Sequence, residues 1–224
     1  MAKRVEFQWS AGTAQGEVVE PKGNEKVPAV VLIQEYWGVN DHIRSLLDRL
    51  AAAGFLAIAP DLYDGKITKS ADEAGALMNS LDWPKAVGYI DGAAKWALAQ
   101  PRCNGKVGVM GFCLGGALTI ASSTQSKVFS AAVSFYGMPP FDKTHWENIS
   151  APLQAHVATH DQWVTVESAN RVKDKLTSLG KSVEMHTYDA NHAFVNDTRP
   201  EVHDPVAAKQ AWDRATAFLH AHVG

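Results

Sequence analysis

The chain has 224 residues, which suits one sizeable core and lies at the upper end for a single domain. Its formal net charge is −3, so no basic excess would draw the protein to nucleic acid. Lys3 and Arg4 are followed by no apolar run typical of a secretion signal, and the longest apolar stretch, 55–60, is far too short to span a bilayer. We therefore expect a soluble, cytoplasmic protein that forms one domain over residues 1–224.

Predicted strands and helices alternate along the chain. In chain order, strands are expected at residues 7–9, 17–20, 29–33, 55–59, 106–110, 131–135, 153–158 and 183–188. Helices are expected at residues 41–53, 72–80, 83–99, from 117 onward, 166–179 and 205–222. The first two strands should form an antiparallel hairpin with Gly12 and Gly16 near its turn, and Asn40 or Asp41 should cap the first helix. The alternation predicts an α/β fold, with a mainly parallel central sheet covered by helices on both faces.

The most informative segment is 108–116, Gly-Val-Met-Gly-Phe-Cys-Leu-Gly-Gly. Residues 111–115 fit the pattern Gly-x-nucleophile-x-Gly, with Cys113 at the position that serine usually holds, between a predicted strand and a predicted helix. Such a turn needs small neighbours, because the nucleophile has a strained backbone. It lifts one side chain above the sheet and directs the N–H of Leu114 toward a developing oxyanion. The segment therefore predicts nucleophilic catalysis by Cys113.

A cysteine nucleophile needs a base, and the base needs an orienting partner. In an open α/β sheet these groups lie in loops beyond the carboxyl ends of strands. Asp161 follows the predicted strand 153–158, and His192 follows the predicted strand 183–188. The chain order nucleophile, acid, histidine is that of the α/β-hydrolases. Asp189 is a rival acid, although it lies very near His192 along the chain, and Asp161 could instead cap the helix that follows it.

Four segments resemble the dienelactone hydrolases, or carboxymethylenebutenolidases, a cysteine-dependent branch of the α/β-hydrolases. These segments are 34–40 (Gln-Glu-Tyr-Trp-Gly-Val-Asn), 59–63 (Ala-Pro-Asp-Leu-Tyr), 108–116 and 190–194 (Ala-Asn-His-Ala-Phe). The resemblance implies an α/β-hydrolase without a large cap domain. It also implies hydrolysis of esters or lactones through a thioester, with Cys113 as nucleophile, His192 as base and Asp161 as its partner. Glu35 would accept the cysteine proton when substrate arrives.

The resemblance also implies roles for residues around the nucleophile. Tyr36 would supply a second oxyanion N–H beside that of Leu114, and Tyr136 would line the substrate pocket. Trp37 and Trp163 stand in the two loops nearest to the predicted chemistry, so we expect both to contribute to the pocket wall.

The chain departs from the family at its substrate-binding arginines. The family binds a substrate carboxylate with two arginines, one in the segment corresponding to 66–80 and one four residues after the histidine. No arginine occurs in 66–80, and the second position holds Asn196. An amide replaces neither the charge nor the bidentate geometry of a guanidinium. We therefore expect the reaction class to be kept, Lys66 or Lys69 to supply a cation, Asn196 to face the substrate, and Glu35 to have a different partner.

Two other functions would use the same thiol. One is acyl transfer from the Cys113 thioester to an alcohol or thiol, and the other is a non-enzymatic response of the thiol to electrophiles or peroxide, which needs no triad partners. His156 and His160 are four residues apart, but no nearby group completes a ligand set, so we expect no metal and no cofactor. The expected partner is a small-molecule ester or lactone. Nucleic acid and membrane are not expected partners, and the protein should be a monomer or a weak homodimer.

Overall fold

The structure is a computed structural model that describes residues 2–224. In chain order the strands are β1 (Lys3–Trp9), β2 (Gly12–Val19), β3 (Val27–Ile33), β4 (Leu56–Pro60), β5 (Cys103–Phe112), β6 (Ala131–Phe135), β7 (Leu153–Ala158) and β8 (Val183–Tyr188). The helices are α1 (Asp41–Ala52), α2 (Ala71–Asn79), α3 (Trp83–Leu98), α4 (Leu114–Gln125), α5 (Val166–Ser178) and α6 (Pro205–Val223), with short 3₁₀ turns η1 (Phe141–Lys143) and η2 (Trp146–Asn148). Every strand and helix expected from the sequence is present.

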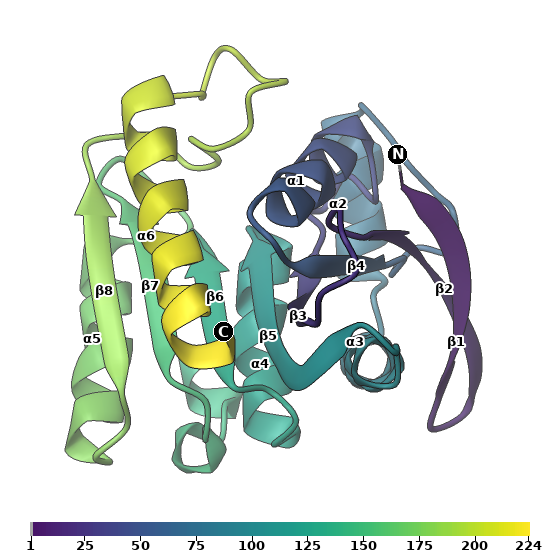
Figure 1. Cartoon of the computed structure of the whole chain (residues 1–224). Helices are drawn as coiled ribbons and strands as arrows, with labels where there is room; N and C mark the ends of the chain where they lie inside the picture. The colour runs from purple at the N-terminus through teal and green to yellow at the C-terminus, as the bar shows by residue number, and fades with distance from the viewer. Residues whose placement is uncertain (1) are drawn as a thin grey trace.

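The strands form one sheet in the order β1-β2-β4-β3-β5-β6-β7-β8 (Figure 1). β1 pairs antiparallel with β2, and β2 pairs antiparallel with β4. All remaining neighbours are parallel. The predicted α/β fold with a mainly parallel sheet is therefore confirmed. Because parallel strands end at the same edge, the loops after β3, β5, β6, β7 and β8 meet there.

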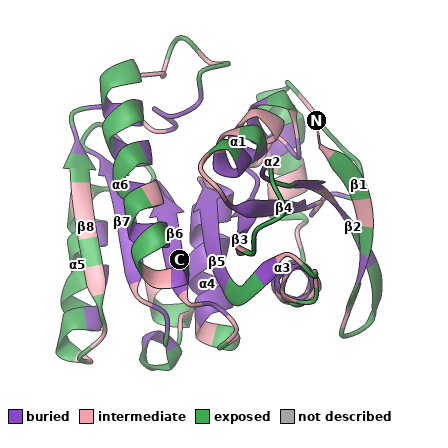
Figure 2. Ribbon diagram, viewed as in Figure 1, coloured by how far each residue is buried: buried purple, intermediate pink, exposed green. Residues whose placement is uncertain are grey.

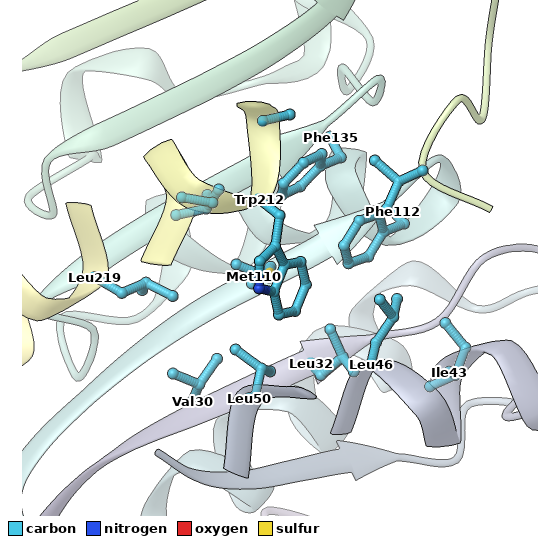
Figure 3. Packing of buried hydrophobic residues seen from close by; sticks show 14 of the residues in the cluster. Val30, Leu32, Ile43, Leu46, Leu50, Met110, Phe112, Phe135, Trp212 and Leu219 are labelled. Atoms are coloured by element: carbon cyan, nitrogen blue, oxygen red, sulfur yellow. The ribbon is translucent and has the colours of Figure 1, made fainter. Parts of the chain in front are cut away.

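Helices cover both faces of the sheet, as expected for a parallel sheet (Figure 1). α1 and α6 lie on one face, where they pack with Val30 and Leu32 of β3. α3, α4 and α5 lie on the other, where Val31 and Ile33 of the same strand point. Figure 3 shows the first of these two layers, in which Trp212 of α6 packs near Met110 and Phe112 of β5. The central strands are buried between the two layers (Figure 2).

The position expected for Gly16 is wrong. Gly16 lies inside β2, paired with Val5, and the turn of the hairpin falls at residues 10–11. A Cβ on Gly16 would stand 2.7 Å from the carbonyl oxygen of Ala59 in β4 and 3.2 Å from the ring of Phe7. The glycine is therefore needed for close strand packing rather than for a turn. Gly12, with φ of 151°, does begin β2 directly after the turn, as expected.

No unit within residues 2–224 stands apart from the sheet as a large cap domain. None of the helices in this part of the chain is long and apolar enough to cross a membrane.

Candidate active site

Cys113 stands at a sharp turn between β5 and α4. Its φ of 55° lies in the left-handed region, which residues other than glycine rarely adopt. Its N–H donates to the carbonyl oxygen of Phe135 at 3.0 Å, and its own carbonyl oxygen accepts the N–H of Ala117 at 3.2 Å. These two bonds hold the strained residue between the sheet and the helix. Cys113 as a whole residue is only partly buried.

Two glycines allow this turn to form. A Cβ on Gly111 would collide with the carbonyl oxygen of Gly115, and a Cβ on Gly115 would collide with the carbonyl oxygens of Ile33 and Gln34. α4 therefore approaches β5 and the end of β3 at backbone contact, which no other residue type permits. This close approach brings the first turn of α4 beside the loop that follows β3.

His192 and Asp161 lie in loops after the neighbouring strands β8 and β7. Nδ1 of His192 and Oδ2 of Asp161 are 2.6 Å apart. Oδ1 of Asp161 accepts the N–H groups of Trp163 and Val164 at 2.8 and 3.0 Å. The Asp161 side chain is fully buried, and the His192 side chain is 14% exposed. The carboxylate is thus fixed on both oxygens and orients the imidazole so that Nε2 remains for another group.

The charges of the three groups support one another. Burial alone would lower the pKa of His192, but its hydrogen bonds to Asp161 and Cys113, together with the charges of both groups, raise that pKa to about 10. Burial alone would raise the pKa of Asp161, but the hydrogen bond and charge of His192 and the two backbone N–H groups lower it. Asp161 and Cys113 both therefore favour the protonated form of the imidazole.

Glu35 lies in the loop after β3 and is held by neutral donors. Asn196 Nδ2 donates to its Oε2 at 2.7 Å, and the Tyr136 hydroxyl donates to its Oε1 at 3.4 Å. Asn196 Oδ1 in turn accepts the N–H and the hydroxyl of Thr198 at 3.1 and 2.7 Å. Glu35 and Asn196 are both buried. The different partner expected for Glu35 is thus Asn196 itself, whose amide is used within the protein rather than directed to open space.

Tyr136 follows β6 and is almost completely buried, with φ of 38°. Its ring lies beside the imidazole of His192, with ring centroids 5.1 Å apart. Burial raises the pKa of its phenol well above the usual value, the charges of Glu35 and Cys113 add to this effect, and the N–H of Val195 opposes it as a donor to the hydroxyl. The hydroxyl is therefore held protonated as a donor to Glu35, while the ring packs against the imidazole of His192.

The two N–H groups expected to bind an oxyanion come from different loops. Leu114 is the first residue of α4, so its N–H belongs to the helix end that lacks intrahelical acceptors and attracts negative charge. Tyr36 follows Glu35, and the chain bends around it because the N–H of Gly38 donates to the carbonyl oxygen of Glu35 at 3.4 Å. Among residues 2–224, no acceptor is recorded for either N–H. Both remain available to a ligand.

The tryptophans expected in the pocket wall each contact a residue of the predicted site. Trp163 is 78% exposed, and its ring meets that of His192 edge-on at 4.9 Å between centroids. Trp37 packs on Tyr36, with ring centroids 4.3 Å apart. The guanidinium of Arg199 lies 5.5 Å from the Trp37 ring. Exposed aromatic surface of this kind suits contact with an apolar part of a substrate.

Arg199 is a site neighbour that the sequence reasoning missed. Its charge lowers the pKa of the Tyr36 phenol, against the dominant upward effect of burial. It was detectable, because it is the only Lys or Arg between Lys181 and Lys209 and follows His192 by seven residues. The two lysines proposed as cations, Lys66 and Lys69, are exposed in the loop between β4 and α2.

Asp189, the rival acid, and His156, the rival metal ligand, are both hydrogen-bonded to residues outside the predicted triad. Asp189 is exposed and pairs with His160, with Oδ1 and Nε2 2.6 Å apart. His156 is fully buried, with Nδ1 2.8 Å from the Tyr188 hydroxyl and Nε2 3.0 Å from Gln154 Oε1. Both ring nitrogens of His156 are therefore used in hydrogen bonds, one to β8 and one within β7.

The strained cysteine between β5 and α4 and the mainly parallel sheet beneath it are features of an α/β-hydrolase. A family model described as the dienelactone hydrolase family matches residues 14–223, and the chain belongs to this family. Membership places it among the carboxylic ester hydrolases.

Relatives of known name span nearly the whole chain. "Protein usf" of Aquifex pyrophilus is 33% identical over 235 residues and is covered, like this chain, over 100% of its length. "Carboxymethylenebutenolidase 1" of Cupriavidus pinatubonensis is 29% identical over 206 residues, which cover 88% of this chain and 87% of the relative. A crystal structure from Klebsiella pneumoniae subsp. pneumoniae, of a protein assigned by name to the dienelactone hydrolases, superposes with a TM-score of 0.89 at 25% identity and 99% coverage of both chains.

Proposed function

We propose that this protein hydrolyses small-molecule esters or lactones through a triad of Cys113, His192 and Asp161. The single observation that carries the proposal is the 2.6 Å contact between His192 Nδ1 and Asp161 Oδ2. It leaves Nε2 of the imidazole for the nucleophile, and the nearby Cys113 helps to raise the pKa of His192. An imidazole held between a carboxylate and a thiol is the arrangement that activates a cysteine nucleophile.

In the acylation half-reaction, the Cys113 thiolate attacks the ester carbonyl carbon and the carbonyl π electrons move to oxygen. The N–H groups of Tyr36 and Leu114 bind the resulting oxyanion, and each such donor lowers the barrier by on the order of 3 kcal/mol. The oxyanion then collapses, the bond to the leaving oxygen breaks, and the His192 imidazolium gives its proton to that oxygen. The products are an alcohol, a thioester on Cys113 and a neutral His192.

In the deacylation half-reaction, neutral His192 takes a proton from water as that water attacks the thioester carbonyl. Collapse of the second tetrahedral adduct breaks the C–S bond and releases the acid. The thiolate and the imidazolium are restored, so proton and charge balance over the cycle. Asp161 keeps the same ring nitrogen protonated throughout, and this directs Nε2 to the reacting groups.

We infer that Glu35 acts with Asn196 and Tyr136 as a buried polar support beside the nucleophile. Its carboxylate accepts hydrogen bonds from both, and its charge and that of Cys113 both act on the Tyr136 phenol. A carboxylate so placed can accept the thiol proton when Cys113 is neutral and substrate has entered. Such a transfer would give the same attacking thiolate as the imidazole route.

The experiment that tests the proposal compares Cys113→Ala with Cys103→Ala, using p-nitrophenyl acetate as substrate. Cys113→Ala should lower kcat by about 10³-fold or more, because the nucleophile acts as one unit with its base. Cys103→Ala should keep the wild-type rate, because Cys103 lies at the other end of β5. Acid-quenched wild type should carry one acetyl group on Cys113 by peptide mass spectrometry. Retained activity in Cys113→Ala, or an acetyl group on another residue, would refute the proposal.

A further inference from the structure

The hydroxyl of Tyr63 is a buried polar group that the mechanism above does not use. Tyr63 follows the end of β4 and is 6% exposed. Within the part of the chain that the structure describes, its hydroxyl has no hydrogen-bond partner. An unpaired buried hydroxyl is unfavourable, and native proteins pair nearly all such groups. An exception in a native fold calls for an explanation, and a catalytic role is one such explanation.

The loop that carries Tyr63 is firmly bonded. Asp61 accepts the N–H of Tyr63 with Oδ1 at 3.0 Å and the N–H of Gly65 with Oδ2 at 2.6 Å. The side-chain oxygen of Gln34 accepts the N–H of Leu62 at 3.2 Å. The backbone of this turn is therefore fixed by two side chains, that of Asp61 at the start of the turn and that of Gln34 in the loop after β3. Because the backbone of this turn is rigid, it holds the unpaired hydroxyl in a fixed position, where a ligand could accept its hydrogen bond.

The same loop borders the proposed oxyanion site. Gln34 immediately precedes Glu35 and Tyr36, and its carbonyl oxygen would stand 2.6 Å from a Cβ on Gly115 in the first turn of α4. The loop after β3 therefore contacts both the turn that carries Tyr63 and the N-terminus of α4. Burial raises the pKa of the Tyr63 phenol, and the charge of Cys113 raises it further. The phenol stays protonated and can only donate to an anionic neighbour.

Other buried tyrosines of the chain are bonded differently. The Tyr136 hydroxyl donates to Glu35, and the Tyr188 hydroxyl is bonded to His156 and Arg214. Tyr89 is 6% exposed like Tyr63, and the ammonium of Lys85 lies 5.2 Å from the centroid of its ring. Among the described residues, its hydroxyl is not one of the buried polar atoms without a partner. The unpaired hydroxyl of Tyr63 is thus not a general feature of tyrosines in this fold.

We propose that the Tyr63 hydroxyl donates a hydrogen bond to an oxygen of the ester group that reacts at Cys113. This inference rests on the proposed function, because it needs an ester bound beside that thiol. Both oxygens of an ester accept hydrogen bonds and cannot donate them, so a protonated phenol is a suitable partner. Tyr63 is then a catalytic residue, and the bond forms only when substrate occupies the site.

The test compares Tyr63→Phe with Tyr89→Phe, a matched change at a tyrosine of equal exposure. Tyr63→Phe should lower kcat/KM for p-nitrophenyl acetate by roughly tenfold to hundredfold, because one donor to the reacting group is lost. It should leave Tm unchanged or raise it, because no hydrogen bond of the substrate-free protein is removed. Tyr89→Phe should keep the wild-type kcat/KM.

Two results would overturn the inference. One is a wild-type kcat/KM in Tyr63→Phe, and the other is a lowered Tm in that variant, which would show that the hydroxyl is bonded in the resting protein. Cys113→Ala, assayed in parallel, separates this inference from the proposed function. An active Cys113→Ala refutes the triad, whereas an inactive Cys113→Ala beside a fully active Tyr63→Phe refutes the role of Tyr63 alone.

Discussion

At the scale of single residues, the two buried carboxylates of the candidate site, Asp161 and Glu35, have different kinds of hydrogen-bond donor. Asp161 faces an imidazole and two backbone N–H groups, which together lower its pKa despite burial. Glu35 has no such cation on its oxygens, only the amide of Asn196 and the phenol of Tyr136. A buried carboxylate needs donors on its oxygens to offset lost hydration. The neutral pair therefore leaves the charge of Glu35 less compensated than a guanidinium would.

The raised pKa of His192 predicts how activity depends on pH. Because the imidazolium persists up to about pH 10, kcat/KM should be flat through neutral pH and fall as pH rises through about 10. Asp161→Asn removes a charge that raises this pKa, so the alkaline limb should move to lower pH, and kcat should drop by about 10²-fold or more. A pH-rate profile of both proteins measures this. An unchanged alkaline limb in Asp161→Asn would contradict the assignment.

The same pKa shifts affect folding stability with opposite signs. The pKa of His192 is higher in the folded protein than its ordinary value of 6.5, so its contribution is complete below that pH and is lost as pH rises through about 10. The pKa of Asp161 is lowered from 3.8, so its contribution is present above that pH and is lost as pH falls further. The pair therefore stabilises the fold most between these limits.

At the scale of elements, α4 is the helix that defines the site. Its N-terminus meets β5 through Gly111 and meets the end of β3 through Gly115. Its buried face extends from Leu114 to Ser123, so the helix cannot move away without exposing the core beside β5 and β6. The strained turn at Cys113 is thus maintained by packing on both sides rather than by its own preference.

Two glycine-to-alanine changes in helices should have opposite effects. Gly115→Ala forces a Cβ onto the carbonyl oxygens of Ile33 and Gln34, so it should lower the free energy of unfolding by about 1–3 kcal/mol. Gly75→Ala in α2 meets nothing within 4 Å and should raise it by about 0.5–1 kcal/mol, because alanine favours helix. Urea denaturation measures both. Equal stability of Gly115→Ala and wild type would contradict the tight packing of α4.

At the scale of the whole molecule, two hydrophobic layers share one sheet. Neighbouring residues of β3 point into opposite hydrophobic layers. Unfolding of either layer would therefore disrupt the sheet on which the other layer packs. We propose on this ground that residues 2–224 fold as a single domain. The hairpin of β1 and β2 belongs to the same sheet through β4 and packs against α3, so it is tied to the rest.

This architecture predicts one cooperative unfolding transition. Leu46 of α1 and Leu176 of α5 are both fully buried, one in each layer. Leu46→Ala and Leu176→Ala should each lower the free energy of unfolding by about 2–5 kcal/mol. Each should shift the transition as a whole, whether it is followed by far-UV circular dichroism or by tryptophan fluorescence. Two separate transitions, with only one shifted by each substitution, would show that the layers unfold independently.

Local signals in the sequence determined the elements and the turn that carries the candidate nucleophile. The bounds of β6, β7 and β8 follow from short apolar or alternating runs, and the helices follow from apolar spacing and caps such as Asn40. The turn at Cys113 could be predicted because the glycines around it indicate close backbone packing, which a side chain would prevent. Each of these signals concerns residues within a few positions of one another, where backbone geometry alone fixes the outcome.

Only the tertiary structure decided which side chains meet at the site. Asn196 reaches Glu35 across 161 positions of sequence, and Tyr136 reaches it across 101. The unpaired hydroxyl of Tyr63 and the placement of Arg199 beside Trp37 likewise depend on how several loops converge. Such contacts follow from the order and register of the parallel strands, which bring distant loops to one edge of the sheet. No local pattern encodes that convergence, because it exists only after the sheet has formed.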